Sequence, residues 1–457
     1  MSLEEEIHRL RDENTELRQQ VADLQEVVAQ LEGELSDARE VIEKAKKKPP
    51  SWVKPNKPKK EGPKQPRRKR EATANKARRR EVPTRIVKHK LERCPDCSYP
   101  LFREKVAHVH QVVDIPPLVA VEVTEHQAIA GWCPHCQRWH APRLELGEEV
   151  LGQGRFGIRV TSLIAYLRTA MRLPFGQIQD LLQALYQLHV GLGELVELLH
   201  RVRKAGQGEV DALREAARAS FVVHMDETGW REDGRNGFAW TVSVPGVQAI
   251  RSFTRENGRN HLIVKGLVGG SFKGVLCSDF LASYNTYAGP HQRCWAHLLR
   301  ALHELKEDHP EDRDVQTWAS AVRELYDEGQ SMAKATSPPS GAQRLACYEG
   351  LVRRAVELGQ RYALSRKHPC QALAKRLLRH QDELFPFVLY EQVSADNNLA
   401  ERSLRPLVIA RKISGGTRSP AGTDTRMALA SLFGTWTARG LNPYTECLAL
   451  LRQSSLP

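Results

Sequence analysis

The clearest pattern of hydrophobic positions is a heptad repeat in the first 42 residues. Leucine at the d positions with mostly β-branched residues at the a positions favours a parallel two-stranded coiled coil, and an asparagine at one a position fixes its register. We therefore predict a leucine-zipper coiled coil and a homodimer over residues 1–45; a helix packed inside a globular domain is the alternative. The repeat consists of Leu3, Leu10, Leu17, Leu24 and Leu31 at d, and Ile7, Asn14, Val21, Val28, Leu35 and Ile42 at a.

Amphipathic helical spacing returns in residues 146–215. Three helices are predicted, over residues 161–172, 175–187 and 192–206, separated by Pro174 and by glycines. Three short helices of this kind are compatible with a helix-turn-helix that binds DNA or with a helical connector.

Alternating strand patterns follow, and we expect a multidomain α/β protein from them. Strands are predicted over residues 221–230, 237–244, 248–254 and 272–280, with a helix over 261–269 and a strand or strand-to-helix step over 292–299. This order indicates an α/β unit with a mixed sheet in residues 216–299. Residues 300–395 have helical patterns only and are interpreted as an insertion. Residues 396–457 are expected to complete the unit, beginning with a short polar helix that Pro406 limits or kinks.

Composition narrows the class of protein. The 457 residues, 41% hydrophobic and 27% charged, are enough for roughly three folding units. We find no apolar run of 18 residues, so we expect no membrane span, and the charged start MSLEEEIHRL is unlike a secretory signal. Nine cysteines, an odd number, argue against a disulfide framework and favour the reducing cytoplasm.

Positive charge is concentrated in one proline-rich segment. Residues 46–90 hold 19 Lys and Arg against 3 Asp and Glu, a local charge of +16 in a chain of net charge +13. Such a run is typical of an arm that binds a polyanion, usually nucleic acid; a solvated linker is the other interpretation. Seven prolines exclude one continuous basic helix, and the segment follows the zipper, so a basic leucine-zipper factor is disfavoured.

Two CxxC pairs predict a zinc-binding module in residues 91–145. Cys94 and Cys97, with Cys133 and Cys136, would supply four thiolates to a structural Zn²⁺ in a small zinc ribbon, with strands expected around residues 120–131. Four cysteines close the coordination shell, which disfavours a catalytic zinc, and two pairs disfavour a redox CxxC. The alternative ligands are His108, His110, His135 and His140.

Carboxylates at strand ends are the candidate chemistry. Asp226 and Asp279 lie near the ends of apolar strands, where an unpaired buried carboxylate is costly. Adjacent strands would bring the two together, and a divalent cation would relieve their repulsion. Glu401 is the third candidate, on a helix face shared with Asn397 and Arg405. Strand-end aspartates that only cap turns are the alternative. The rivals for the third position are Asp396, Glu227 and Asp424.

Several of these segments resemble the insertion-sequence-66 family of DDE transposases. The resemblance rests on HMDETGW (224–230), SDFLASY (278–284), CWAH (294–297), DNNLAERSLRPLVIARK (396–412) and GGTRS (415–419), together with the zipper and the CxxC pairs. It implies a ribonuclease H-like catalytic domain interrupted by a helical insertion.

Matched residue by residue, the resemblance makes Asp226, Asp279 and Glu401 catalytic, holding two Mg²⁺ or Mn²⁺ ions. It implies cleavage of insertion-sequence ends and their transfer to target DNA, and small accessory proteins as partners. Basic residues after the glutamate are candidates for contacts with DNA phosphates: Arg405, Arg411 and Lys412.

Other roles and functions remain open from the sequence. Trp230 and Trp295 would stack on bases or pack in the core, and His297 would contact the scissile phosphate or cap a helix. The main alternative to a transposase is a dimeric zinc-containing DNA-binding protein with an inactive catalytic domain. A nuclease that cuts without joining is the third hypothesis.

Overall fold

The structure is a computed structural model, and it describes residues 82–454 apart from 104, 107, 114–120, 148 and 153. The predicted coiled coil (1–45) and most of the basic segment (46–90) lie outside the described residues. The chain divides into two compact units, Met1–Asp114 and Ile115–Pro457, and each is described by itself. Among the described helices, none has the length and apolar character needed to cross a membrane.

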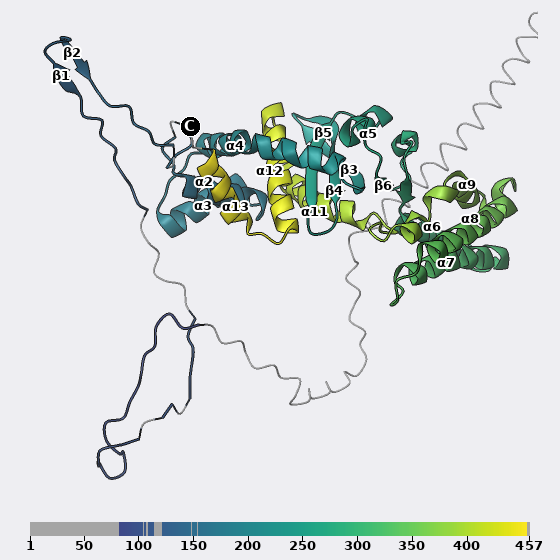
Figure 1. Cartoon of the computed structure of the whole chain (residues 1–457), viewed down its shortest axis with the longest axis horizontal. Coiled ribbons are helices and arrows are strands. Elements are labelled where there is room, and N and C mark those ends of the chain that lie inside the picture. Colours follow the sequence, from purple (N-terminus) through teal and green to yellow (C-terminus); the bar gives the residue numbers. More distant parts are fainter. Residues whose placement is uncertain are drawn as a thin grey trace, which may run out of the picture. The chain divides into compact units, whose positions relative to one another are not determined.

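A five-stranded mixed sheet forms the centre of the second unit (Figure 1). Its strands are β3 (Val222–Glu232), β4 (Arg235–Val244), β5 (Ile250–Glu256), β6 (Val275–Ser278) and β7 (His291–Arg293), in the spatial order β5-β4-β3-β6-β7. The first three form an antiparallel meander, and β6 and β7 run parallel to β3. Asp233 and Gly234 form the two-residue turn between β3 and β4, and both have positive φ, as such a hairpin requires. The predicted mixed sheet is therefore confirmed.

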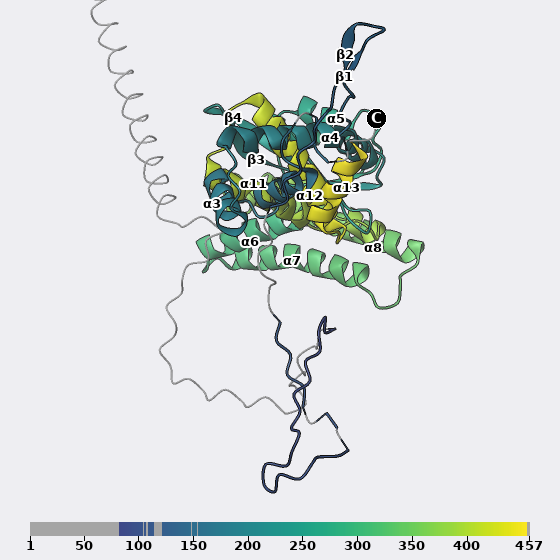
Figure 2. The same cartoon turned by 90° about the vertical axis from the view of Figure 1, so that its left-hand side faces the viewer.

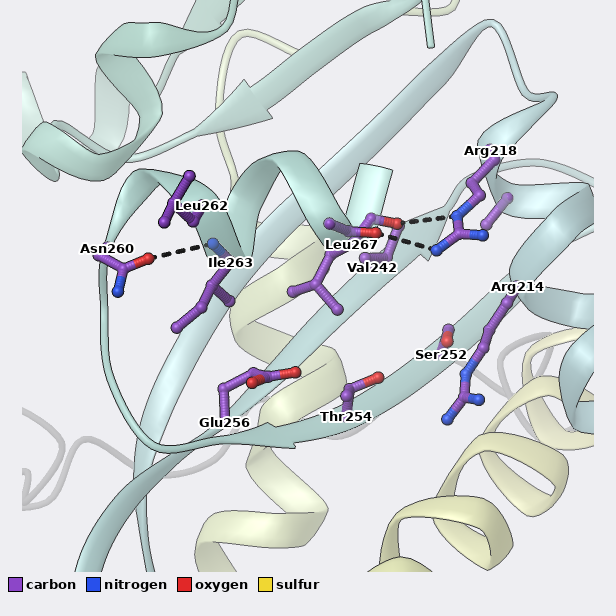
Figure 3. Close-up of a pocket in the computed structure, with 12 residues that line it drawn as sticks. Arg214, Arg218, Val242, Ser252, Thr254, Glu256, Asn260, Leu262, Ile263 and Leu267 are labelled. Atoms are coloured by element: carbon purple, nitrogen blue, oxygen red, sulfur yellow. Dashed lines mark hydrogen bonds between the residues drawn. The ribbon is translucent and has the colours of Figure 1, made fainter. Parts of the chain in front are cut away.

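One face of the sheet is covered by long amphipathic helices. Val223, Met225 and Trp240 point into the core on this face. The helices of this layer and its flank are α2 (Ile158–Thr169), α3 (Phe175–Tyr186), α4 (Leu192–Arg218), α5 (His261–Val268) and α13 (Pro443–Gln453). A pocket of about 460 Å³ lies between α4, α5 and β5, where Arg218 donates to the carbonyls of Gly266 and Leu267 (Figure 3).

The opposite face is covered by α11 (Asn398–Ser414) and α12 (Pro420–Ala438). Trp230 and Phe253 of the sheet pack there against Leu404 of α11. The expectation that Pro406 limits a short helix is wrong, because α11 has 17 residues and continues through that proline; a kink at Pro406 stays a prediction. Proline has no backbone N–H, so the carbonyl of Arg402, four residues before Pro406, loses its usual helical donor. Both residues are exposed, so water can donate to that carbonyl instead.

Residues 300–395 are helical, as predicted, and pack around a core of their own. The helices are α6 (Trp295–Asp308), α7 (Arg313–Ala333), α8 (Gly341–Ala363), α9 (Gln371–Arg379) and α10 (Pro386–Leu389), with a short 3₁₀ turn at Gln381–Glu383. Another 3₁₀ turn, Ala282–Thr286, lies between β6 and β7. Figures 1 and 2 both show α6, α7 and α8 side by side. Trp318 and Phe385 are buried in this core, which also contains Val275 and Cys277 of β6.

The cysteine-containing segments have little regular structure. Strands β1 (Gly131–Cys133) and β2 (Arg138–His140) form a short antiparallel hairpin. The strand expected over residues 120–131 is wrong for its described part, since residues 121–130 belong to no strand. Those residues are mostly exposed, so their alternating pattern has no buried face to stabilise it.

A charged network joins the helical insertion to β7. The guanidinium of Arg293, which is fully buried, donates to Glu383 at 2.6 Å, and His380 lies 2.7 Å from the same oxygen. Burial alone would raise the pKa of Glu383, but His380, His291 and Arg293 lower it to about 2. The insertion is therefore held to the sheet by a carboxylate that stays ionised.

We expect Glu383→Ala to lower the free energy of unfolding by about 3 kcal/mol at pH 7, because it leaves Arg293 buried and unpaired. The depressed pKa means that this contribution is present above about pH 4.5 and is lost as the pH falls through about 2. Urea unfolding at pH 7 and pH 3 measures both effects. Glu349→Ala, at an exposed position of α8, is the control; an equal effect of both variants would contradict the role of Glu383.

Candidate active site beside β3 at the end of β6

Asp226 and Asp279 are brought together by the parallel pairing of β3 and β6. His224 opposite Cys277 is the last pair of this register, and Asp226 and Asp279 each come two residues later in the chain. Each carboxylate also accepts a backbone N–H at 2.9 Å, Asp226 from Glu227 and Asp279 from Leu281. The prediction that Asp226 lies near the end of its strand is wrong, because β3 continues to Glu232. Asp279 directly follows the last residue of β6, so the two aspartates meet where β6 ends beside the middle of β3.

Glu401 reaches this position because the start of α11 is anchored to the sheet. Asn397 is 1% exposed, and its side-chain amide donates to the carbonyl of Met225 at 2.7 Å. Its oxygen lies 3.2 Å from Nδ1 of His224, and its backbone N–H contacts Sγ of Cys294 at 3.1 Å. Glu401 is four residues after Asn397, so the two share one helix face.

The pKa of Asp226 reports how crowded these carboxylates are. Burial raises it first, and the charges of Glu227, Asp279 and Glu401 raise it further, to about 8. The three residues predicted from the sequence thus lie in one electrostatic neighbourhood. Carboxylate oxygens are the ligands preferred by Mg²⁺ and Mn²⁺. In the part of the chain that the structure describes, however, the oxygens of Asp226, Asp279 and Glu401 do not all lie within 4.8 Å of one another.

Glu227 is a fourth carboxylate beside this cluster. It follows Asp226 on β3 and so points to the opposite face of the sheet. Tyr284 donates to one of its oxygens at 3.2 Å, and Arg259 lies 3.4 Å from the other. Burial and Asp279 raise the pKa of Glu227, whereas these two donors oppose the shift.

Two of these contacts were missed from the sequence. Tyr284 lies inside the SDFLASY segment and so carried a signal, but Arg259 lies in a polar turn with none. The rivals for the third position have other partners: Asp396 accepts from the backbone of Asn398 at 3.0 Å, and Asp424 lies 3.6 Å from Arg203 of α4.

His297 lies beside Glu401. Its Nε2 is 3.8 Å from a Glu401 oxygen, and its Nδ1 is buried with no hydrogen-bond partner in the described part of the chain. Cys294 completes a group whose ligand atoms lie within 4.8 Å of one another. Burial raises the pKa of Cys294 to about 11, so its thiol is neutral and a poor metal ligand. His297 therefore lies beside the carboxylate of Glu401. Of the two roles considered for Trp230 and Trp295, core packing is the one the structure shows, because both side chains are buried.

The three basic residues of α11 differ in their surroundings. Arg405 and Lys412 are exposed. Arg411 is half-buried and donates to the carbonyl of Gly229 and to Oγ1 of Thr228. Arg411 thus fastens α11 to β3, which sequence reasoning did not anticipate.

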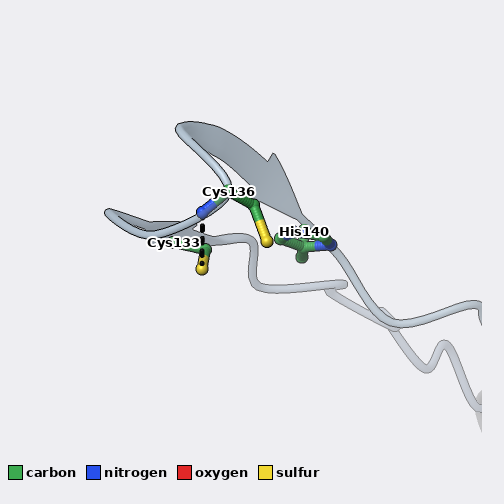
Figure 4. Close-up of side chains that lie close together, drawn as sticks. All are labelled: Cys133, Cys136 and His140. Atoms are coloured by element: carbon green, nitrogen blue, oxygen red, sulfur yellow. Dashed lines mark hydrogen bonds between the residues drawn. The ribbon is translucent and has the colours of Figure 1, made fainter.

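The second CxxC pair lies in the β1–β2 hairpin (Figure 4). The backbone N–H of Cys136 donates to Sγ of Cys133 at 3.4 Å, and the ligand atoms of Cys133, Cys136 and His140 lie within 4.8 Å of one another. The backbone N–H and thiol of Cys136 lower the pKa of Cys133. These three residues therefore fit a zinc ion, with His140 among the predicted alternative ligands.

The first CxxC pair lies in the other compact unit and has a similar local environment. Cys94 and Tyr99 are joined by a backbone hydrogen bond of 2.9 Å, which closes a tight turn. The backbone N–H groups of Asp96 and Cys97 lower the pKa of Cys94. This turn therefore favours the thiolate form that zinc requires.

We expect Asp226→Asn to stabilise the cation-free protein at high pH. The pKa of Asp226 is raised in the folded state, so its stabilising proton is present at pH 4 and is lost as the pH rises through about 8. The variant should gain on the order of 2 kcal/mol over the wild type at pH 9 and almost nothing at pH 5, because water screens part of the shift.

Urea unfolding with EDTA at the two pH values measures this difference. Asp424→Asn, at an exposed carboxylate on α12, is the matched control. A gain for Asp226→Asn that is equal at pH 5 and pH 9 would show that the fold does not raise the pKa of Asp226.

Comparison with known proteins shows the family to which the chain belongs. The model described as "Transposase IS66 family" matches residues 153–425, more than half of the chain, including Asp226, Asp279 and Glu401. The chain is also 28% identical over 196 residues to the "Uncharacterized protein y4jO" of Sinorhizobium fredii (strain NBRC 101917 / NGR234). That match covers 43% of this chain and 57% of the relative's length. On the extent of the family match, the chain belongs to the IS66 family of transposases.

Proposed function

We propose that the protein is a DNA transposase that cleaves insertion-sequence ends and joins them to target DNA. The observation that carries the proposal is the convergence of Asp226 and Asp279, through the β3–β6 register, with Glu401 from α11. Three carboxylates from distant parts of the chain have no structural need to meet at one sheet edge, and their repulsion is costly without a cation.

The sheet supports a ribonuclease H-like assignment. Three antiparallel strands are followed by two parallel ones in the order β5-β4-β3-β6-β7, and Asp226 lies on the central strand. We infer that residues 216–299 and 396–457 form one catalytic domain that the helical insertion (300–395) interrupts. The insertion then returns the chain to the sheet just before Asn397, which sets the position of Glu401.

The chemistry follows from the charge at this edge. Asp226, Asp279 and Glu401 would hold divalent cations, Mg²⁺ or Mn²⁺, which stabilise charge on the phosphate and favour deprotonation of the attacking hydroxyl. In each step an oxygen attacks phosphorus, one P–O bond forms and another breaks, so no energy source is needed. The carboxylates fix the reacting groups at the sheet edge, and His297 sets the orientation of Glu401.

Basic residues would position the DNA. Arg405 and Lys412 lie exposed on the helix that carries Glu401, where they are suited to phosphate contacts that carry no sequence information. Arg411 would act indirectly, because it holds α11 against β3. The basic segment (46–90) would add affinity that falls steeply with salt.

Assembly and zinc complete the proposal. A coiled coil over residues 1–45 would pair two chains, so that two element ends meet two active sites. The zinc-binding module (91–145) would be structural, with Cys94, Cys97, Cys133 and Cys136 as ligands and His140 as the alternative. Small accessory proteins are further candidate partners.

A strand-transfer assay with labelled element ends and Mg²⁺ tests the proposed function. We expect the wild type to give cleaved and joined products, and Asp226→Ala, Asp279→Ala and Glu401→Ala each to lower the rate at least about 10³-fold, because each removes a cation ligand.

The matched control is Asp424→Ala, which removes a carboxylate of α12 that pairs with Arg203, and we expect it to keep its activity. Cleavage without joining would favour a nuclease. Binding without cleavage by the wild type would favour a DNA-binding protein with an inactive catalytic domain.

Elemental analysis of purified variants tests the zinc ligands. We expect Cys94→Ser and Cys133→Ser to lose the bound zinc, because each removes one of four thiolates, whereas Cys347→Ser on α8 keeps it. If Cys94→Ser retains a full equivalent while His140→Ala loses it, the four-cysteine set is wrong and His140 is a ligand.

A further inference from the structure

A pocket of about 570 Å³ lies on the α11–α12 face of the sheet and is separate from the carboxylates. It is formed by the end of α2, by β5, and by one side each of α11 and α12. Its lining includes Arg172, Arg251, Arg402 and Arg426, and no aspartate or glutamate. A cavity of this size is in the range that holds a small organic ligand.

The guanidinium groups of this pocket have no carboxylate partner in the part of the chain that the structure describes. Arg251 donates only to the carbonyls of Val244 and Ile250, and Arg426 only to that of Arg168. Burial and the neighbouring Arg402 lower the pKa of Arg251, and burial and Arg168 lower that of Arg426. The pocket therefore concentrates positive charge that the described residues do not neutralise.

The pocket on the other face of the sheet shows how arginines are ordinarily accommodated in this fold. There Arg214 donates to Asp211 at 3.2 Å and Arg218 to Glu215 at 2.7 Å, and Glu256 also contributes to the lining (Figure 3). Both pockets contain arginines, but only the α11–α12 pocket leaves them without acidic neighbours. An anionic ligand would supply the missing charge.

The rest of the pocket wall is apolar and contains one unused polar atom. Phe253, Leu399, Pro406 and Phe433 line it. Oγ1 of Thr169, also in the lining, is shielded from solvent and has no hydrogen-bond partner among the residues that the structure describes. The complementary ligand combines phosphate with a flat, largely apolar body that carries hydrogen-bonding atoms, which describes a nucleotide.

The position of the pocket favours a nucleotide that is part of a DNA strand. Arg402 follows Glu401 directly on α11, so the pocket and the carboxylates lie on adjacent sides of one helix turn. A strand that crosses this turn would pass both. A base inside a duplex is stacked and paired, so only an unpaired nucleotide can enter a pocket.

We propose that this pocket binds an unpaired nucleotide of the DNA strand, with its phosphate at Arg172 and Arg402 and its base against the apolar wall. The inference rests on the proposed function, since it takes DNA as the ligand. It adds a specificity element: recognition of the DNA where the duplex is frayed or broken, apart from the chemistry at Asp226.

Binding is measured with the full-length Asp226→Ala protein, so that no cleavage intervenes. The probes are a labelled blunt duplex and the same duplex with a three-nucleotide single-stranded end that carries 2-aminopurine. We expect tighter binding of the overhang probe, and a change of 2-aminopurine fluorescence as the base leaves water.

Two kinds of variant separate charge from shape. Arg172→Gln/Arg402→Gln should weaken binding of the overhang probe about tenfold more than that of the blunt probe, and should reduce its salt slope by about 1.4, since each lost single-strand phosphate contact contributes about 0.7. Ala438→Phe keeps every charge but fills the pocket, so it should abolish the fluorescence change and the preference for the overhang.

Arg452→Gln, at an exposed position of α13, removes one positive charge elsewhere and should leave the preference unchanged. Thermal unfolding checks that each variant is folded. Equal weakening of both probes by the double variant, or an unchanged preference in Ala438→Phe, would overturn the proposal.

A free nucleotide is the other source of the same chemistry, and dAMP tests it. Suppose the pocket variants lose dAMP binding but keep the preference for the overhang probe. Free nucleotides would then be the ligands of the pocket, and the proposal would be wrong. If the protein binds neither duplex, the proposed function fails as well; if it binds both without preference, only the pocket inference fails.

Discussion

The hydrogen bonds of Asn397 are the constraint on which the candidate active site depends. β3 and β6 set the two aspartates by their register alone, but Glu401 arrives after a long helical insertion. Asn397 is buried and joins the start of α11 to Met225, His224 and Cys294. A buried amide without these partners would cost about 1–3 kcal/mol, so the network selects one position of α11 and hence of Glu401.

The same edge of the sheet holds charges that oppose folding. Burial and three neighbouring carboxylates raise the pKa of Asp226 to about 8. The remaining structure tolerates this cost because the sheet is covered on both faces and the insertion is held by the separate Arg293–Glu383 pair. The surrounding packing thus holds these carboxylates close together despite their mutual repulsion, and a cation-binding site needs such an arrangement before the cation binds.

The sequence predicted the elements well where one periodicity dominated. The strand patterns between residues 221 and 254 indicated β3, β4 and β5, and the run over residues 272–280 indicated β6. It failed at Pro406, because solvent exposure allows α11 to continue, and at residues 121–130, whose alternation has no core to face. Arg259 near Glu227 and Arg411 on β3 could not be predicted, since both contacts join residues far apart in the chain.

Helix α11 separates two opposite charge environments within one turn. Glu401 faces a cluster of carboxylates, whereas Arg402 faces arginines that lack acidic partners. Adjacent residues of a helix do not face each other, so these two opposite charges do not pair. The fold keeps them on different sides of the helix, the acidic side suited to cations and the basic side to phosphate. The DNA strand and cations that we propose as ligands would satisfy both sides at once, so binding, rather than further folding, would complete the electrostatics of this helix.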